Sequence, residues 1–326
     1  MRRRSFLIGG GMTLASALAR PAVHAQSAWP HGQPIRMVVP FPAGAGVDGM
    51  ARLAAERLQD KLGATIIVEN RPGGAGVVGT TAVMQAKPDG YTLLGSAINH
   101  VVLNLVLRGA TFDPQKDFEC VARTASAPLV MVIAPQRPER TLTEILESAK
   151  RAPKEWTFAV PSLTAPAHLA AIDFMRRTGV KFTLAYYRGA APALTDVLGG
   201  HVQLMVDSAF TMVPAALDGR LRAIGVTSRQ RSPLAPQIPT MIEAGVPDFV
   251  ADSWYGIWAP KGTPVDIRQR INDVMREAMA DPEIVKKLQG WFLEPVAESI
   301  DQTETFIAGE VPRVVALLKS VDFQPQ

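Results

Sequence analysis

The chain has 326 residues, of which 47% are hydrophobic and 20% are charged. Its first 25 residues contain four arginines and no acid, so the remainder carries 30 basic and 30 acidic residues and is formally neutral. Because no basic patch interleaved with aromatic residues is present, nucleic-acid binding is not expected. About 300 residues after the first 25 are enough for two lobes.

The first 25 residues have the pattern of an export signal. Arginines at 2–4 precede an apolar run at 6–15, and small residues at 23–25 fit a cleavage site that would leave Gln26 as the new N-terminus. The run is too short to span a bilayer, and no later run approaches 18 apolar residues. Residues 3–7 also fit the twin-arginine pattern, so either export route is open. We expect an exported, soluble protein with cleavage near Ala25.

Cysteine and histidine are too sparse to build a disulfide or a metal site. Cys120 is the only cysteine, and we expect it to be a small buried residue. The histidines after the signal, at 31, 100, 168 and 201, lie far apart with no ligand spacing. We therefore expect no metal and no cofactor.

Strands and helices alternate along the first third of the chain. Strands are predicted at 35–39, 65–69 and 91–94, and helices at 48–62 and about 77–87. Gly63 follows the first helix where a C-cap glycine is expected. This alternation is typical of a parallel or mixed sheet flanked by helices.

A second set of such units follows and the chain then returns to the first. Strands are predicted at 129–133, 156–160, 181–187, 201–206, 221–226 and 254–259. The spacing of Thr141 and Glu144 predicts a capping box, and a further helix is expected at 167–177. Thr263 and Pro264 are expected to provide the N-cap and first residue of a late helix, which a short helix around 284–288 follows.

This order predicts an α/β protein of two lobes, each a mixed sheet with flanking helices. The first lobe would comprise residues 26–126 and 250–326, and the second residues 127–249. Two crossings, near 124–128 and 249–254, would form the hinge. The natural ligand site is then the cleft between the lobes, where loops at the carboxyl ends of strands face each other.

The segment 39–48 is the most informative part of the chain. A strand ends, a loop containing Gly44, Ala45 and Gly46 follows, and a helix begins. Main-chain N–H groups at such a helix start can bind an anion without a charged side chain. The alternative is a simple connecting turn, with Asp48 as the N-cap of the helix.

The same segment also satisfies a dinucleotide-binding fingerprint, with glycine spacing over 44–49 and an acid, Glu69, 20 residues later. Three features argue against that reading. The prolines of 40–42 separate strand and glycines, Asp48 would repel a pyrophosphate, and a second glycine cluster at 73–76 has no role in such a fold. A cofactor-dependent exported enzyme is therefore the weakest alternative.

In the second lobe a similar strand–loop–helix start contains Ser162, Thr164 and His168, of which the histidine fits a packing role as well as a ligand contact. Asp207 and Ser208 follow a predicted strand and are expected to face the cleft. Neither a nucleophile elbow nor a Ser/His/Asp set is present. Catalysis is not expected.

Five segments, in order, resemble the Bug or TctC type of extracytoplasmic receptor of tripartite tricarboxylate transporters. They are 39–52, 68–76, 88–94, 187–200 and 259–264. The resemblance implies a two-lobed type II periplasmic binding protein that holds a carboxylate near the Phe-Pro-Ala-Gly loop. It implies ligand contacts from Phe41, Ala43, Gly44, Ala45, Asp48, Ser96, Asn99, Ser162, Thr164, His168 and Asp207.

This chain departs from the family pattern in two places. Ala45 interrupts a glycine run, and the second-lobe loop at 159–166 lacks the usual glycines and contains two prolines. We expect that loop to be stiff and its side of the pocket to be narrow. Because no arginine is assigned to the pocket, a polycarboxylate is not favoured over a monoacid.

The function that follows is capture of a small carboxylate-bearing metabolite for delivery to integral membrane transporter subunits. We expect a monomer that does not itself span the membrane. The alternative is a ligand-sensing receptor that serves a membrane signalling partner, since both functions need the same cleft.

Overall fold

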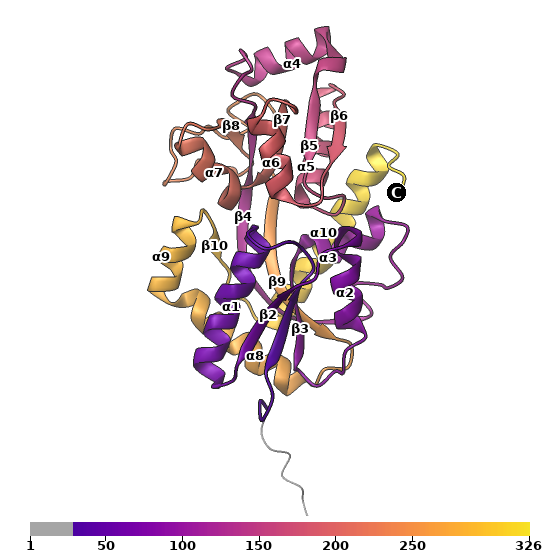
Figure 1. Ribbon diagram of the computed structural model, residues 1–326, viewed down its shortest axis with the longest axis vertical. Helices are drawn as coiled ribbons and strands as arrows, with labels where there is room; N and C mark the ends of the chain where they lie inside the picture. Colours follow the sequence, from indigo (N-terminus) through magenta and orange to yellow (C-terminus); the bar gives the residue numbers. More distant parts are fainter. Residues whose placement is uncertain (1–28) are drawn as a thin grey trace, which may run out of the picture.

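The computed structural model describes residues 29–326, so the predicted export signal lies outside the described residues. Figure 1 shows two lobes, one above the other, joined by two long strands. The strands are β1 Ile35–Val39, β2 Ile66–Asn70, β3 Thr92–Ala97, β4 Phe118–Ile133, β5 Thr157–Val160, β6 Thr183–Tyr186, β7 Leu204–Ser208, β8 Arg222–Val226, β9 Asp252–Pro260 and β10 Glu294–Pro295. The α-helices are α1 Gly46–Leu62, α2 Val77–Met84, α3 Ile98–Val106, α4 Leu142–Arg151, α5 Pro166–Thr178, α6 Ala190–Leu198, α7 Ala209–Leu217, α8 Val265–Ala280, α9 Pro282–Gly290 and α10 Ile300–Ser320.

The strands form one continuous mixed sheet in the order β2-β1-β3-β9-β4-β7-β5-β6. Parallel pairs stand at both ends, where β1 pairs with β2 and β3, and β5 pairs with β6 and β7. The central pairs, β3 with β9, β9 with β4 and β4 with β7, are antiparallel. The alternation in the sequence therefore predicted the architecture correctly.

One strand, β4, belongs to both lobes. The sequence indicated a strand only from residue 129, whereas β4 begins at Phe118. Its first part pairs with β9, and its last part pairs with β7 and β8. The predicted hinge segments 124–128 and 249–254 meet in this antiparallel ladder, where Ser126 lies opposite Trp254. The residue boundaries given above for the lobes stay a prediction.

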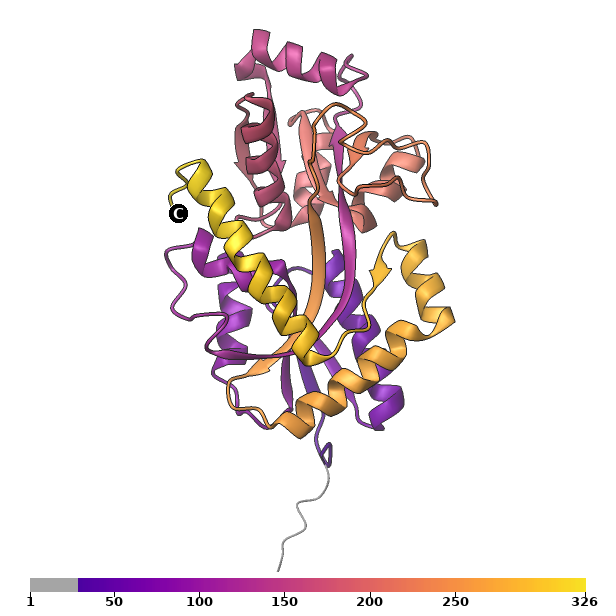
Figure 2. The same ribbon diagram turned by 180° about the vertical axis from the view of Figure 1, so that it is seen from behind.

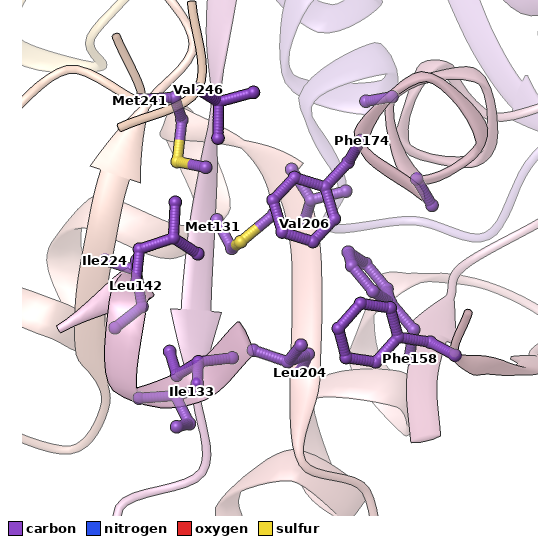
Figure 3. Close-up of a cluster of buried hydrophobic side chains, with 14 of the residues drawn as sticks. Met131, Ile133, Leu142, Phe158, Phe174, Leu204, Val206, Ile224, Met241 and Val246 are labelled. Atoms are coloured by element: carbon purple, nitrogen blue, oxygen red, sulfur yellow. The ribbon is translucent and has the colours of Figure 1, made fainter. Parts of the chain in front are cut away.

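Each lobe has its own apolar core. Figure 3 shows the core of the second lobe, where β4, β5 and β7 contribute alternate side chains such as Met131, Phe158 and Val206. Phe174 of α5 packs on this sheet face, and its ring lies 6.3 Å from that of Phe158. Burial of such surface drives folding, and the two cores fix the walls of the cleft between them.

Two local predictions are confirmed by the structure and a third is wrong. The capping box at Thr141 and Glu144 is confirmed, and Cys120 is buried and free as expected. The prediction that Thr263 is the N-cap of α8 was wrong, because the helix begins at Val265 with Pro264 as its N-cap. The Thr263 hydroxyl instead donates to the carbonyl of Pro260 (2.7 Å), which closes the preceding turn.

The last helix crosses the waist of the molecule. In Figure 2, α10 (yellow) lies on the near side and runs obliquely from the first lobe toward the second. The segment after it returns to the first lobe, where the Gln326 N–H donates to the Val106 carbonyl (3.1 Å). Within residues 29–326 no helix combines the length and the apolar character that crossing a membrane requires.

Candidate functional site

A pocket of about 300 Å³ lies between the lobes, at the edge where several strands end and helices begin. The first lobe contributes the loop from Phe41 to Val47. The second lobe contributes the starts of α5, α6 and α7, and between them Pro161, Ser162, Arg188 and Asp207. Helix N-termini from both lobes therefore face one cavity, a setting that favours an anion.

The start of α1 offers main-chain donors to this pocket. Ala45 is the N-cap and has an extended backbone, and its carbonyl accepts the first intrahelical bond, from the Gly49 N–H (3.0 Å). The N–H groups of Gly46 and Val47 precede that bond and have no partner inside the helix. Both residues line the pocket, so their amides can bind a ligand oxygen.

Asp48 holds this loop in place and does not line the pocket. It lies within the first turn of α1 and not at its N-cap. Its carboxylate accepts hydrogen bonds from the Gly44 N–H (3.0 Å), Arg52 Nε (3.0 Å) and Asn70 Nδ2 (2.9 Å). Burial alone would raise the pKa of Asp48, but these hydrogen bonds lower it below its usual value. Because Asn70 also donates to the Phe41 carbonyl (3.1 Å), one carboxylate organises the loop from 41 to 44.

Tyr255 forms the floor of the pocket beside this loop. Its ring is 2% exposed, and its hydroxyl is 3.0 Å from Ser208 Oγ on the second lobe. A Cβ at Gly46 would overlap the Tyr255 hydroxyl and lie 3.0 Å from Cζ. Residue 46 must therefore be glycine for the helix start to approach so closely. Burial raises the pKa of Tyr255 to about 12, so the hydroxyl keeps its proton.

Seven of the residues predicted to contact a ligand line this pocket: Phe41, Ala43, Gly44, Ala45, Asn99, Ser162 and Asp207. Asn99 is 6% exposed, and its side-chain amide makes no hydrogen bond to a described residue. It is thus a buried polar group that a ligand could satisfy. Loss of solvation raises the pKa of Asp207 to about 6.

The other four predicted contacts lie outside the pocket. Asp48 bonds to the loop at Gly44. Ser96 borders a small separate cavity that Tyr255 also lines. Thr164 is 1% exposed, and its hydroxyl donates to the Ala75 carbonyl of the first lobe (2.8 Å). This bond gives the second glycine cluster, 73–76, a contact between the lobes.

His168 is fully buried and does not line the pocket. Its Nδ1 donates to the Leu163 carbonyl (2.6 Å), so Nε2 can accept from the Tyr186 hydroxyl (3.3 Å). The ring also packs edge-on against Phe323. Burial lowers the pKa of His168, which is consistent with a neutral ring in the interior.

Four pocket residues with polar side chains were not predicted individually: Arg188, Thr211, Ser253 and Tyr255. Arg188 lies within the segment 187–200 that carried part of the family resemblance, so that signal could have identified it. Tyr255 and Ser253 come from a strand remote in sequence from the loop at 41–47, and no local pattern brings these together.

The chemistry available here is binding. Among residues 29–326 no group of three or more His, Cys, Asp or Glu side chains could hold a metal ion. The pocket offers main-chain amides, hydroxyls and an amide side chain around a largely apolar cavity. These groups donate hydrogen bonds to an anionic oxygen and carry no nucleophile paired with a base.

Comparison with known proteins places the chain in a family of receptors. Residues 50–323 match the family model described as tripartite tricarboxylate transporter family receptor. The BugT protein of Bordetella pertussis is 37% identical over 290 residues, which are 88% of this chain and 89% of BugT.

Solved structures agree with this match. The periplasmic binding protein BugD has a TM-score of 0.84 at 30% identity, over 90% of this chain and 99% of BugD. R. palustris Rpa4515, solved with adipate, has a TM-score of 0.87 at 30% identity, over 91% of this chain and all of that one. MatC from Rhodopseudomonas palustris, solved with malate, has a TM-score of 0.82 at 27% identity, over 87% and 98%. The fold is thus that of a two-lobed periplasmic binding protein, and the chain belongs to the receptor family of the tripartite tricarboxylate transporters.

Proposed function

We propose that this protein captures a small carboxylate in the pocket between its lobes and delivers it to a membrane transporter of the tripartite tricarboxylate type. The observation that carries the proposal is the start of α1, where Gly46 and Val47 line the pocket and their N–H groups have no partner inside the helix. An anionic oxygen is the ligand that such a helix start favours.

The relatives support this ligand class. Rpa4515 was solved with adipate and MatC with malate, and both ligands are carboxylates. In this chain the seven pocket-lining residues predicted from the sequence, among them Asn99 and Ser162, are the proposed contacts. Hydrogen bonds to a charged group contribute roughly 1.5–3 kcal/mol each. Three or four of them, offset by the entropy of association, are consistent with a micromolar Kd, or about −8 kcal/mol.

Closure of the lobes follows from the same geometry. A carboxylate docked on the first lobe gains further contacts from second-lobe groups such as Ser162 only when the second lobe approaches. Contacts made only in the closed form shift the equilibrium toward it. The closed form is then the one that the membrane partner would recognise.

The site of action is the periplasm, with the export signal of residues 1–25 removed near Ala25. The signal pattern and the family of receptors both support this location. A signalling receptor would use the same pocket but a different membrane partner. Cross-linking of the loaded protein in membranes, with identification of the captured subunit, separates the two functions.

The direct test is calorimetric titration with straight-chain acids, with the matching primary amides as controls. Hexanoate and hexanamide differ in charge but hardly in size. The proposal predicts that acids bind with micromolar Kd and that their amides do not bind measurably. Equal binding of both, or turnover of any acid, would contradict it.

A further inference from the structure

Arg188 is the single basic residue among the pocket-lining residues of the described chain. Its guanidinium has no ion-pair or hydrogen-bond partner within residues 29–326, and the residue is exposed at the pocket rim. The nearest acid of the following helix, Asp196, accepts a hydrogen bond from the Tyr187 hydroxyl (2.7 Å). A cation at the edge of a pocket is therefore left without a counter-ion.

The backbone on both sides of Arg188 is fixed. The Tyr187 N–H donates to the Val160 carbonyl (2.9 Å), and the Gly189 N–H donates to the Pro161 carbonyl (2.9 Å). Gly189 has a φ of 129°, and a Cβ there would lie 3.4 Å from Pro42 of the opposite lobe. The segment thus sits where the two lobes meet, and Arg188 extends from an anchored backbone at the rim of the pocket.

The remaining wall between Arg188 and the start of α1 is mainly apolar. On the second lobe it is formed by the first two turns of α6, with Ala190, Ala191 and Leu194, and on the first lobe by Phe41 and Val47. Such a wall accepts a hydrocarbon chain. A linear ligand with a carboxylate at each end would place one anion at the start of α1, the other beside Arg188, and its methylene groups against this wall.

We propose that Arg188 makes the pocket selective for linear dicarboxylates over monocarboxylates of the same length, by pairing with the second carboxylate at the rim. This rests on the proposed function, in which the first carboxylate binds at the start of α1. Asp207, the one acid lining the pocket, is the main opposing charge. Its loss of solvation disfavours the charged form, which lessens its repulsion of a second anion.

The test compares diacids of four to eight carbons, succinate to suberate, with the monoacids butyrate to octanoate by calorimetry. The wild type should bind its best diacid at least tenfold more tightly than the monoacid of equal length. In Arg188→Gln this preference should fall to within about twofold, while the monoacid Kd stays unchanged. Arg220→Gln, which removes a surface arginine outside the pocket, is the matched control and should keep the full preference.

The outcomes separate the two proposals. If monoacids bind as tightly as diacids, or if Arg188→Gln weakens both alike, the role of Arg188 is overturned while carboxylate binding stands. If none of the acids binds, the proposed function fails and this inference fails with it. Thermal unfolding of Arg188→Gln, expected to match that of the wild type, shows whether the variant is folded.

Discussion

Gly46→Ala is the substitution that most sharply tests how the binding loop is built. The new methyl group would overlap the Tyr255 hydroxyl and lie 3.0 Å from Cζ, where ordinary contacts are 3.4 Å or more. Tyr255 cannot easily withdraw, because its ring is buried, its hydroxyl bonds to Ser208, and its backbone pairs with Ala97 and Ala125. The start of α1 must therefore shift by several tenths of an ångström.

Forcing an extra methyl into a packed site costs about 1–3 kcal/mol, and the better helix propensity of alanine returns at most about 1 kcal/mol. A net cost of about 1–2 kcal/mol should lower Tm by roughly 2–8 °C, at about 2–4 °C per kcal/mol. Acid binding should fall more than tenfold, because the shifted segment carries the amides of residues 46 and 47. Thermal unfolding and calorimetric titration measure the two effects.

Two further variants make the result decisive. Gly309→Ala in α10 places a methyl group where nothing lies within 4 Å, so its Tm and affinity should be unchanged or slightly improved. Adding Tyr255→Phe to Gly46→Ala removes the overlapping oxygen and should recover part of the lost Tm. If Gly46→Ala behaves like Gly309→Ala, the close approach that we describe does not constrain the loop.

Three more substitutions follow from the site. Thr164→Val removes the hydroxyl that donates to the Ala75 carbonyl between the lobes. Acid binding measured by calorimetry should then weaken about fivefold, which corresponds to the loss of a hydrogen bond of about 1 kcal/mol. The control Thr195→Val loses a hydrogen bond within one helix and should leave acid binding unchanged. The raised pKa of Asp207, about 6, favours its neutral form in the folded protein, so its contribution to stability is present below about pH 4 and is lost as pH rises through 6. Asp207→Asn should therefore have a higher Tm than the wild type at pH 7.5 and an equal one at pH 4, and equal Tm values at both pH values would contradict this. Asp48→Ala frees the loop amide of residue 44 and should lower both Tm and acid affinity, and unchanged affinity would show that the loop does not need this carboxylate.

Much of the fold could be predicted because its signals are local. The hydrophobic periodicity of 35–39 and the capping spacing at Thr141 depend on neighbours in sequence, and both predictions agree with the structure. The N-cap predicted at Thr263 was wrong, although its signal is also local. A threonine before a proline can bond backward to a turn as well as forward to a helix, and here the backward bond to Pro260 forms.

The site could be predicted only in part. The loop at 41–45 has a distinctive composition, and the structure places it at the pocket. The partners that complete the pocket come from distant segments, as when Tyr255 reaches Gly46 across 209 positions of the chain. Thr164 shows the reverse case, since a polar residue in a promising loop bonds to the opposite lobe, and sequence alone does not distinguish a ligand contact from a contact between lobes.

A crystal structure of the protein with a bound carboxylic acid tests the central claim most directly. The account predicts one carboxylate at the start of α1, with an oxygen about 2.7–3.2 Å from the amide nitrogen of Gly46 or Val47. A structure in which the acid binds elsewhere, or touches only side chains and leaves both amides facing water, would contradict it.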